Sequence, residues 1–148
     1  MKKITLLILT VIITIIPLLG CTQYYIEKTI DDWEKAINNG DDDALDDLSS
    51  PDSDFWVTWT AKDLIDIYFS GFTPVHYYNL NTSIDNPYAD VFADATYAGV
   101  QVTGGVWFVL KKEETLLSFI FPDWKIYRYY DSHDPDTGEW SEPVWRKP

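Results

Sequence analysis

The chain is poor in the residues that most often carry out chemistry. It has a single cysteine and two histidines in 148 residues, and it has 11 Lys and Arg against 24 Asp and Glu. One cysteine cannot form an internal disulfide, and the few histidines leave Ser-based catalysis without a convincing base. The sequence also lacks the G-x-S-x-G, H-E-x-x-H, P-loop and Rossmann glycine patterns. The sequence therefore carries no motif of the G-x-S-x-G hydrolase, zinc-protease, P-loop or Rossmann classes.

A long apolar run is present only at the N-terminus. Met1-Lys2-Lys3 precedes Ile4 to Leu19, which is broken only by three threonines and Pro17. This run is shorter than the roughly 20 apolar residues that a spanning helix needs. A charged start, an apolar middle and a small-residue end are typical of a secretory signal. The sequence therefore predicts a signal peptide over residues 1–20.

The end of this run explains the lone cysteine. Leu18-Leu19-Gly20-Cys21 resembles the lipobox of prokaryotic lipoproteins, in which a small residue precedes a modified cysteine. The resemblance implies export, cleavage between Gly20 and Cys21, and a diacylglyceryl thioether on Cys21. Such lipid would anchor the protein to the cell envelope, at the outer face of the cytoplasmic membrane or in an outer membrane, through a tether of residues 21–25. The alternative is a transmembrane anchor with an incidental cysteine.

The composition of the mature part limits its partners. Loss of Lys2 and Lys3 leaves 9 basic and 24 acidic residues, a formal charge of 9 − 24 = −15. Such a surface repels nucleic-acid phosphates, so nucleic-acid binding is not expected. The 7 Trp, 10 Tyr and 7 Phe distinguish the chain from a disordered acidic one. They favour either an aromatic-lined pocket or a core of large side chains, in one domain.

Helices are predicted in the first half of the mature part. An amphipathic helix ending at Asn39-Gly40 is indicated by an apolar stripe at helical spacing, namely Ile26, Ile30, Trp33 and Ile37. Asp41 opens a shorter helix, and Thr60 with Asp63 predicts a capping box for a third helix that ends at Gly71. Between them, Phe55 to Trp59 is predicted as a short strand or an extended link.

Strands are predicted after Pro74, where β-branched and aromatic residues dominate. The expected strands are Val75 to Ile84, Ala89 to Thr103, Val106 to Lys112, Leu116 to Phe121 and Trp124 to Tyr130. Helices followed by strands predict an α+β fold with an antiparallel sheet. The acidic extension 131–148 holds Trp140 and Trp145, which are expected to pack back on the domain.

Four stretches in this order resemble the NTF2-like superfamily, including its SnoaL-like branch: "WEKAINNGDDDALDDL", "YADVFADATYAGV", "GGVWFVLKKEE" and "DWKIYRYY". The resemblance covers residues 26–130. It implies a cone, in which the N-terminal helices pack in a curved antiparallel sheet around a pocket. Members include isomerases, dehydratases, epoxide hydrolases, and non-catalytic ligand-binding or dimerising modules. The side chains expected to line the pocket are Trp33, Ile37, Tyr68, Tyr97, Trp107 and Trp124.

Catalytic members of that superfamily place a carboxylate inside the cone, often with Tyr or His. The candidates here are Asp94, His76 and Tyr78, all on predicted strands. If Val91, Ala93, Ala95 and Tyr97 face the core, Asp94 faces water, and His76 is better explained as a structural residue. His133 lies among acids that do not complete an EF-hand pattern, so neither a metal nor a cofactor is expected.

Three functions remain open at this point. The first is a non-catalytic domain, held to the membrane through lipid on Cys21, that binds a small hydrophobic molecule or a protein partner. The second is an isomerase, dehydratase or hydrolase that uses a polar residue in the cone. The third is a structural envelope protein that forms a homodimer through an exposed sheet face.

Overall fold

The computed structural model of the chain describes residues 22–51, 60–115, 118, 121–131 and 139. The predicted signal peptide, Cys21, the predicted link Phe55 to Trp59, and both Trp140 and Trp145 lie outside the described residues. Within the described ranges, no helix has the length and apolar character needed to cross a membrane.

The helices precede the sheet in the chain. Residues 22–39 form one long helix, and Gly40, with φ of 68°, ends it in the left-handed conformation. The long helix includes residues 22–25, which were predicted to belong to a short tether. Helix α2 (Asp42–Asp47) is capped by the Asp41 side chain, as expected.

The third helical segment has two parts. Helix α3 (Ala61–Asp63) begins with the predicted capping box of Thr60 and Asp63. It runs directly into a π-helical turn, η1 (Leu64–Tyr68), which is closed by the bond from the Phe69 amide to the Leu64 carbonyl. Such turns are rare and are often found at functional sites.

Within the part of the chain that the structure describes, five strands follow and form one antiparallel sheet: β1 (Val75–Asp85), β2 (Tyr88–Tyr97), β3 (Val100–Gln101), β4 (Val106–Glu113) and β5 (Asp123–Tyr130). The strand order is β1-β2-β4-β5, with β3 paired to β2. The predicted α+β class is therefore confirmed. The prediction of one strand from Ala89 to Thr103 is wrong, because Ala98 and Gly99 both take positive φ and turn the chain between β2 and β3.

The predicted strand Leu116 to Phe121 falls mostly outside the described residues. Ser118 and Phe121, its described members, are in a turn and a bend rather than a strand.

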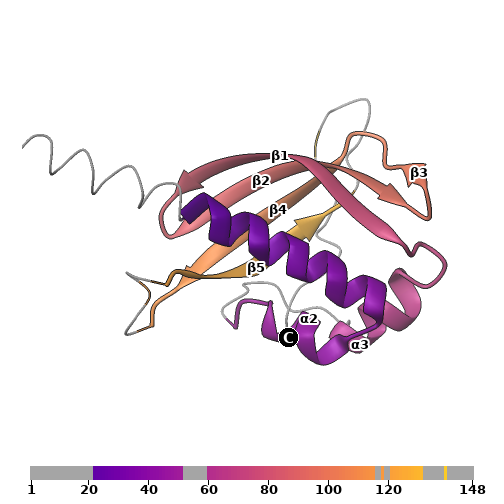
Figure 1. Cartoon of the computed structure of the whole chain (residues 1–148), viewed down its shortest axis with the longest axis horizontal. Coiled ribbons are helices and arrows are strands. Elements are labelled where there is room, and N and C mark those ends of the chain that lie inside the picture. Colours follow the sequence, from indigo (N-terminus) through magenta and orange to yellow (C-terminus); the bar gives the residue numbers. More distant parts are fainter. Residues whose placement is uncertain (1–21, 52–59, 116–117, 119–120, 132–138, 140–148) are drawn as a thin grey trace, which may run out of the picture.

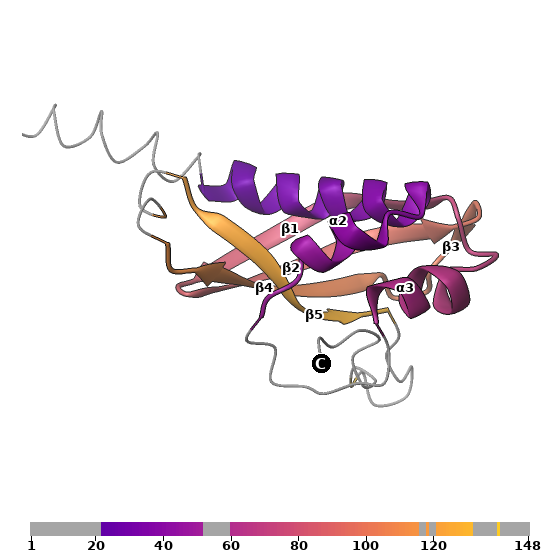
Figure 2. The same ribbon diagram turned by 90° about the horizontal axis from the view of Figure 1, so that it is seen from below.

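The main core lies between the helices and one face of the sheet. Figures 1 and 2 show the long helix running along this face, with α2 and α3 beside it. The predicted stripe of Ile26, Ile30, Trp33 and Ile37 is fully buried there. Opposite this stripe, the inward-facing side chains of the strands are also fully buried, including those of Val91, Ala95, Phe108, Leu110, Ile126 and Tyr129.

Side chains of the long helix also cover part of one sheet edge. Asn38 accepts a hydrogen bond from the Val75 amide at 2.7 Å and donates one to its carbonyl at 2.8 Å. Glu34 accepts one from the Tyr77 amide at 2.8 Å. These three bonds pair backbone N–H and C=O groups at the start of β1, on the side that has no neighbouring strand and where these groups would otherwise be exposed.

Candidate functional site

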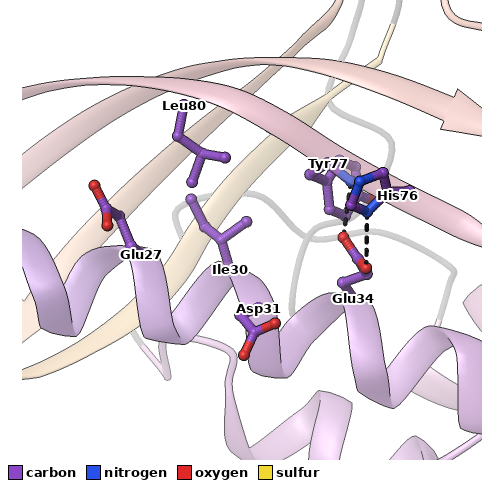
Figure 3. Close-up of a pocket in the computed structure, with 7 residues that line it drawn as sticks. All are labelled: Glu27, Ile30, Asp31, Glu34, His76, Tyr77 and Leu80. Atoms are coloured by element: carbon purple, nitrogen blue, oxygen red, sulfur yellow. Dashed lines mark hydrogen bonds and ion pairs between the residues drawn. The ribbon is translucent and has the colours of Figure 1, made fainter.

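A groove lies between the long helix and β1 (Figure 3). Its volume is about 360 Å³, which falls in the range of small-molecule sites. Seven side chains line it: Glu27, Ile30, Asp31, Glu34, His76, Tyr77 and Leu80. Ile30 and Leu80 face each other across the groove in Figure 3 and form an apolar contact surface between the polar groups.

The groove carries three carboxylates because helical spacing places Glu27, Asp31 and Glu34 on one side of the long helix. Glu34 is held in place by two bonds, one to the Tyr77 amide and one to the His76 ring at 3.2 Å. Asp31 pairs with Lys35, which is exposed. No lysine or arginine is among the lining residues, so the groove favours positively charged groups.

The predicted catalytic residues lie apart from the core. The side chain of His76 is 62% exposed, and its ring stacks on Tyr78 with centroids 5.6 Å apart. Asp94 accepts a hydrogen bond from Asn79 at 2.8 Å. Its neighbours Ala93 and Ala95 are buried, so Asp94 lies on the opposite face of β2 from the core.

The residues predicted to line a pocket fall into three places. Trp33, Ile37 and Trp124 are buried in the main core. Tyr68 and Tyr97 lie near the end of the sheet, next to Asp131. Trp107 lies on the outer face, where it stacks on Phe92 and Tyr130. The structure does not bring these six side chains together around one space.

A carboxyl that the sequence did not single out forms a second candidate site. Asp131 directly follows β5 and accepts hydrogen bonds from the hydroxyls of Tyr68 and Tyr97, the second at 3.4 Å. The Tyr97 hydroxyl also contacts that of Tyr129, which lies 3.1 Å from the hydroxyl of Tyr77. Each phenol has one proton, so Tyr77 donates to Tyr129, Tyr129 to Tyr97, and Tyr97 to Asp131.

Burial controls the protonation of this tyrosine–aspartate chain. It raises the pKa of the Asp131 carboxyl, while the hydrogen bonds from Tyr68 and Tyr97 act in the opposite direction. Burial also raises the pKa of all four tyrosines, so they remain protonated donors at neutral pH. The site therefore offers one carboxylate, held by neutral donors, that is a better proton acceptor than an exposed aspartate.

Aromatic rings surround the end of the tyrosine–aspartate chain at which Tyr97 and Asp131 lie. Phe69 and Phe72 lie edge-on or tilted against Tyr97, with centroids 5.8 and 6.0 Å away. Tyr68 is the last residue of η1, so the π-helical turn delivers its hydroxyl to Asp131. Asp131 was not predictable from the sequence, because its partners lie 63 and 34 positions away. The one available signal was its place at the end of an aromatic strand.

Among the described residues, no group of three or more His, Cys, Asp or Glu side chains converges in a way that could hold a metal ion. Comparison with known proteins gave no family model and no curated protein that matches the chain. The geometry of the site is therefore the basis for any functional conclusion.

Proposed function

We propose that this protein is an exported lipoprotein, anchored through Cys21, whose NTF2-like domain binds a small hydrophobic ligand without transforming it. The groove between the long helix and β1 is the observation that carries this proposal. It combines an apolar contact surface at Ile30 and Leu80 with carboxylates at its margin. A helical first half packed on an open antiparallel sheet supports the NTF2-like assignment.

The chemistry of the groove defines the ligand further. An apolar body would bury against Ile30 and Leu80, at about 25 cal/mol for each Å² removed from water. A positively charged group would lie near Glu27 and Asp31, where each exposed ion pair adds about 0.2–1 kcal/mol. The ligand is therefore a small amphiphilic cation, or an apolar basic segment of a partner protein.

A pair of matched probes tests this proposal. The mature chain with Cys21→Ser is titrated with 1-naphthylmethylammonium and with neutral 1-naphthylmethanol, while NMR follows the Ile30 and Leu80 methyl groups. The ammonium is expected to bind more tightly and to shift both methyls. Glu27→Gln combined with Asp31→Asn should weaken its binding several-fold, whereas Glu114→Gln, an exposed acid outside the groove, should not. Equal affinity for the two probes, or shifts confined to other residues, would contradict the proposal.

A catalytic function is the second candidate, and Asp131 is the observation that favours it. A half-buried carboxyl with a raised pKa, next to phenol donors, has the properties of a general base. An isomerase or dehydratase of the SnoaL-like type would use Asp131 in place of the predicted His76, Tyr78 or Asp94. The test is deuterium exchange at the α′-carbon of a cyclic enone, the saturated carbon next to its carbonyl group, in D₂O. Exchange above the solvent background that Asp131→Asn abolishes would support it, and exchange at the background rate would exclude it for that substrate.

A further inference from the structure

A second apolar cluster lies on the outer face of the sheet, opposite the helices. It consists of Val109, Tyr127 and Tyr130, with Trp107 packed against it. Trp107 and Val109 alternate along β4 with Phe108 and Leu110, which belong to the main core. Every buried apolar residue of the described helices is in the main core, and none is in this outer cluster.

Aromatic side chains on the outer face are much less exposed on β5 than on β2. On β5, Tyr127 and Tyr130 are only 3% and 8% exposed, although they lie on a face that no described helix covers. On the same face, Phe92 and Tyr88 of β2 are 43% and 38% exposed. Phe92, Trp107 and Tyr130 form one stacked row across three strands, with centroid separations of 5.6 and 4.6 Å. A cover therefore lies over the β5 end of the row and leaves the β2 end open.

The chain itself supplies a suitable cover. The C-terminal extension begins next to Tyr130, and Trp140 lies ten positions after Tyr130. Ten extended residues reach about 33 Å, whereas four strands span only about 14 Å. The extension is therefore long enough to lie across the sheet in either direction.

The amino-acid composition of the extension is also suited to binding this surface. Trp140 and Trp145 offer flat rings that match the stacked row. The extension carries four acids, Asp134, Asp136, Glu139 and Glu142, beside Arg146 and Lys147. The outer face presents two cationic side chains over β4 and β5, Lys111 and Arg128, whereas its acids Asp90 and Asp94 lie on β2. Lys111 lies one position beyond Leu110 on β4, and Arg128 lies over the Tyr127 ring at 4.9 Å.

We propose that residues 132–148 dock on the outer face of β4 and β5, with Trp140 and Trp145 on the aromatic row. The extension then occupies the surface through which a second copy would otherwise associate. The mature protein is accordingly a monomer, and its extension prevents pairing through this face. This proposal does not depend on the ligand groove, which lies on the opposite side of the sheet.

Cross-linking of the unaltered mature chain tests the docking without any risk of misfolding. A carbodiimide joins carboxylates to nearby lysines with no spacer. Acids of the extension are expected to join to Lys111, which extends from the outer face. Links only to Lys28, Lys35 or Lys62, which belong to helices on the other side, would overturn the proposal. In a mixture of ¹⁴N and ¹⁵N chains, links between chains in place of links within one chain would show that a second copy is the cover.

Variants of the two tryptophans test the consequence. In Trp140→Ala/Trp145→Ala, hydroxyl-radical labelling of Tyr127 and Tyr130 should rise several-fold, since both would approach the exposure of Phe92. Labelling of Tyr24, which is already 59% exposed, should not change. Sedimentation should show concentration-dependent dimers of this variant, and the Trp140→Phe/Trp145→Phe control should remain protected and monomeric. Unchanged labelling in a folded alanine variant would assign the cover to another part of the chain and overturn the proposal.

Discussion

Replacement of Gly105 by alanine tests how closely the turn before β4 approaches β2. A Cβ atom on Gly105 would lie 2.5 Å from the carbonyl oxygen of Ala93, closer than real Cβ contacts, and Gly105 has φ of 74°. A left-handed conformation costs an L-residue roughly 1–2 kcal/mol. Forcing an added methyl into a filled site costs roughly 1–3 kcal/mol more. Together these terms predict a fall of about 2–5 kcal/mol in the free energy of unfolding.

Gly99→Ala is the matched control, because it separates the two costs. Gly99 has φ of 81°, but nothing lies within 4 Å of the Cβ position. This variant should lose only the conformational term of about 1–2 kcal/mol. Urea unfolding of the mature Cys21→Ser chain, followed by circular dichroism, measures both variants. Equal losses in the two variants, or a larger loss in Gly99→Ala, would refute the close approach of Gly105 to β2.

Three further predictions concern the carboxyl, the sheet edge and the anchor. Because burial raises the folded-state pKa of Asp131, this group stabilises the fold most below its unfolded pKa of about 4, and the contribution is lost as the pH rises through the folded-state pKa. Urea unfolding at a series of pH values should therefore show wild type losing stability relative to Asp131→Asn as the pH rises, and a constant difference would contradict this. Asn38→Ala, which removes both bonds to Val75, should cost about 1–3 kcal/mol and speed hydrogen exchange at the Val75 amide, whereas Asn39→Ala should leave that exchange unchanged. Cys21→Ser should abolish incorporation of labelled fatty acid and release the protein from membranes, and retention of the variant in the membrane fraction would instead favour a spanning anchor.

The helices were predictable because their signals are local. The stripe of Ile26, Ile30, Trp33 and Ile37 fixes one buried face by spacing alone. The caps at Asp41 and at Thr60 with Asp63 need only three neighbouring residues. Four of the five predicted strands overlap described strands for the same reason, since they are short alternating segments between turn residues.

The candidate sites were not predictable because they depend on long-range contacts. The groove needs the long helix beside β1, and its best-held carboxylate, Glu34, bonds to residues 42 and 43 positions later. Asp131 is an ordinary acid after a strand until the π-helical turn places Tyr68 against it. The break between β2 and β3 was missed because Ala98 takes a positive φ that its residue type rarely adopts.

The helical conformation of residues 22–25 affects how the domain would meet its membrane. With lipid on Cys21, the long helix would begin almost directly at the bilayer surface, because residues 22–25 are helical and do not form a flexible linker between anchor and domain. At 1.5 Å per residue, Glu27 lies about 8 Å and Glu34 about 18 Å along the helix from Thr22. With the helix along the membrane normal, the groove would then begin about 8 Å and end about 18 Å beyond the anchored end of the helix. A ligand would therefore reach it from the layer of medium next to the membrane.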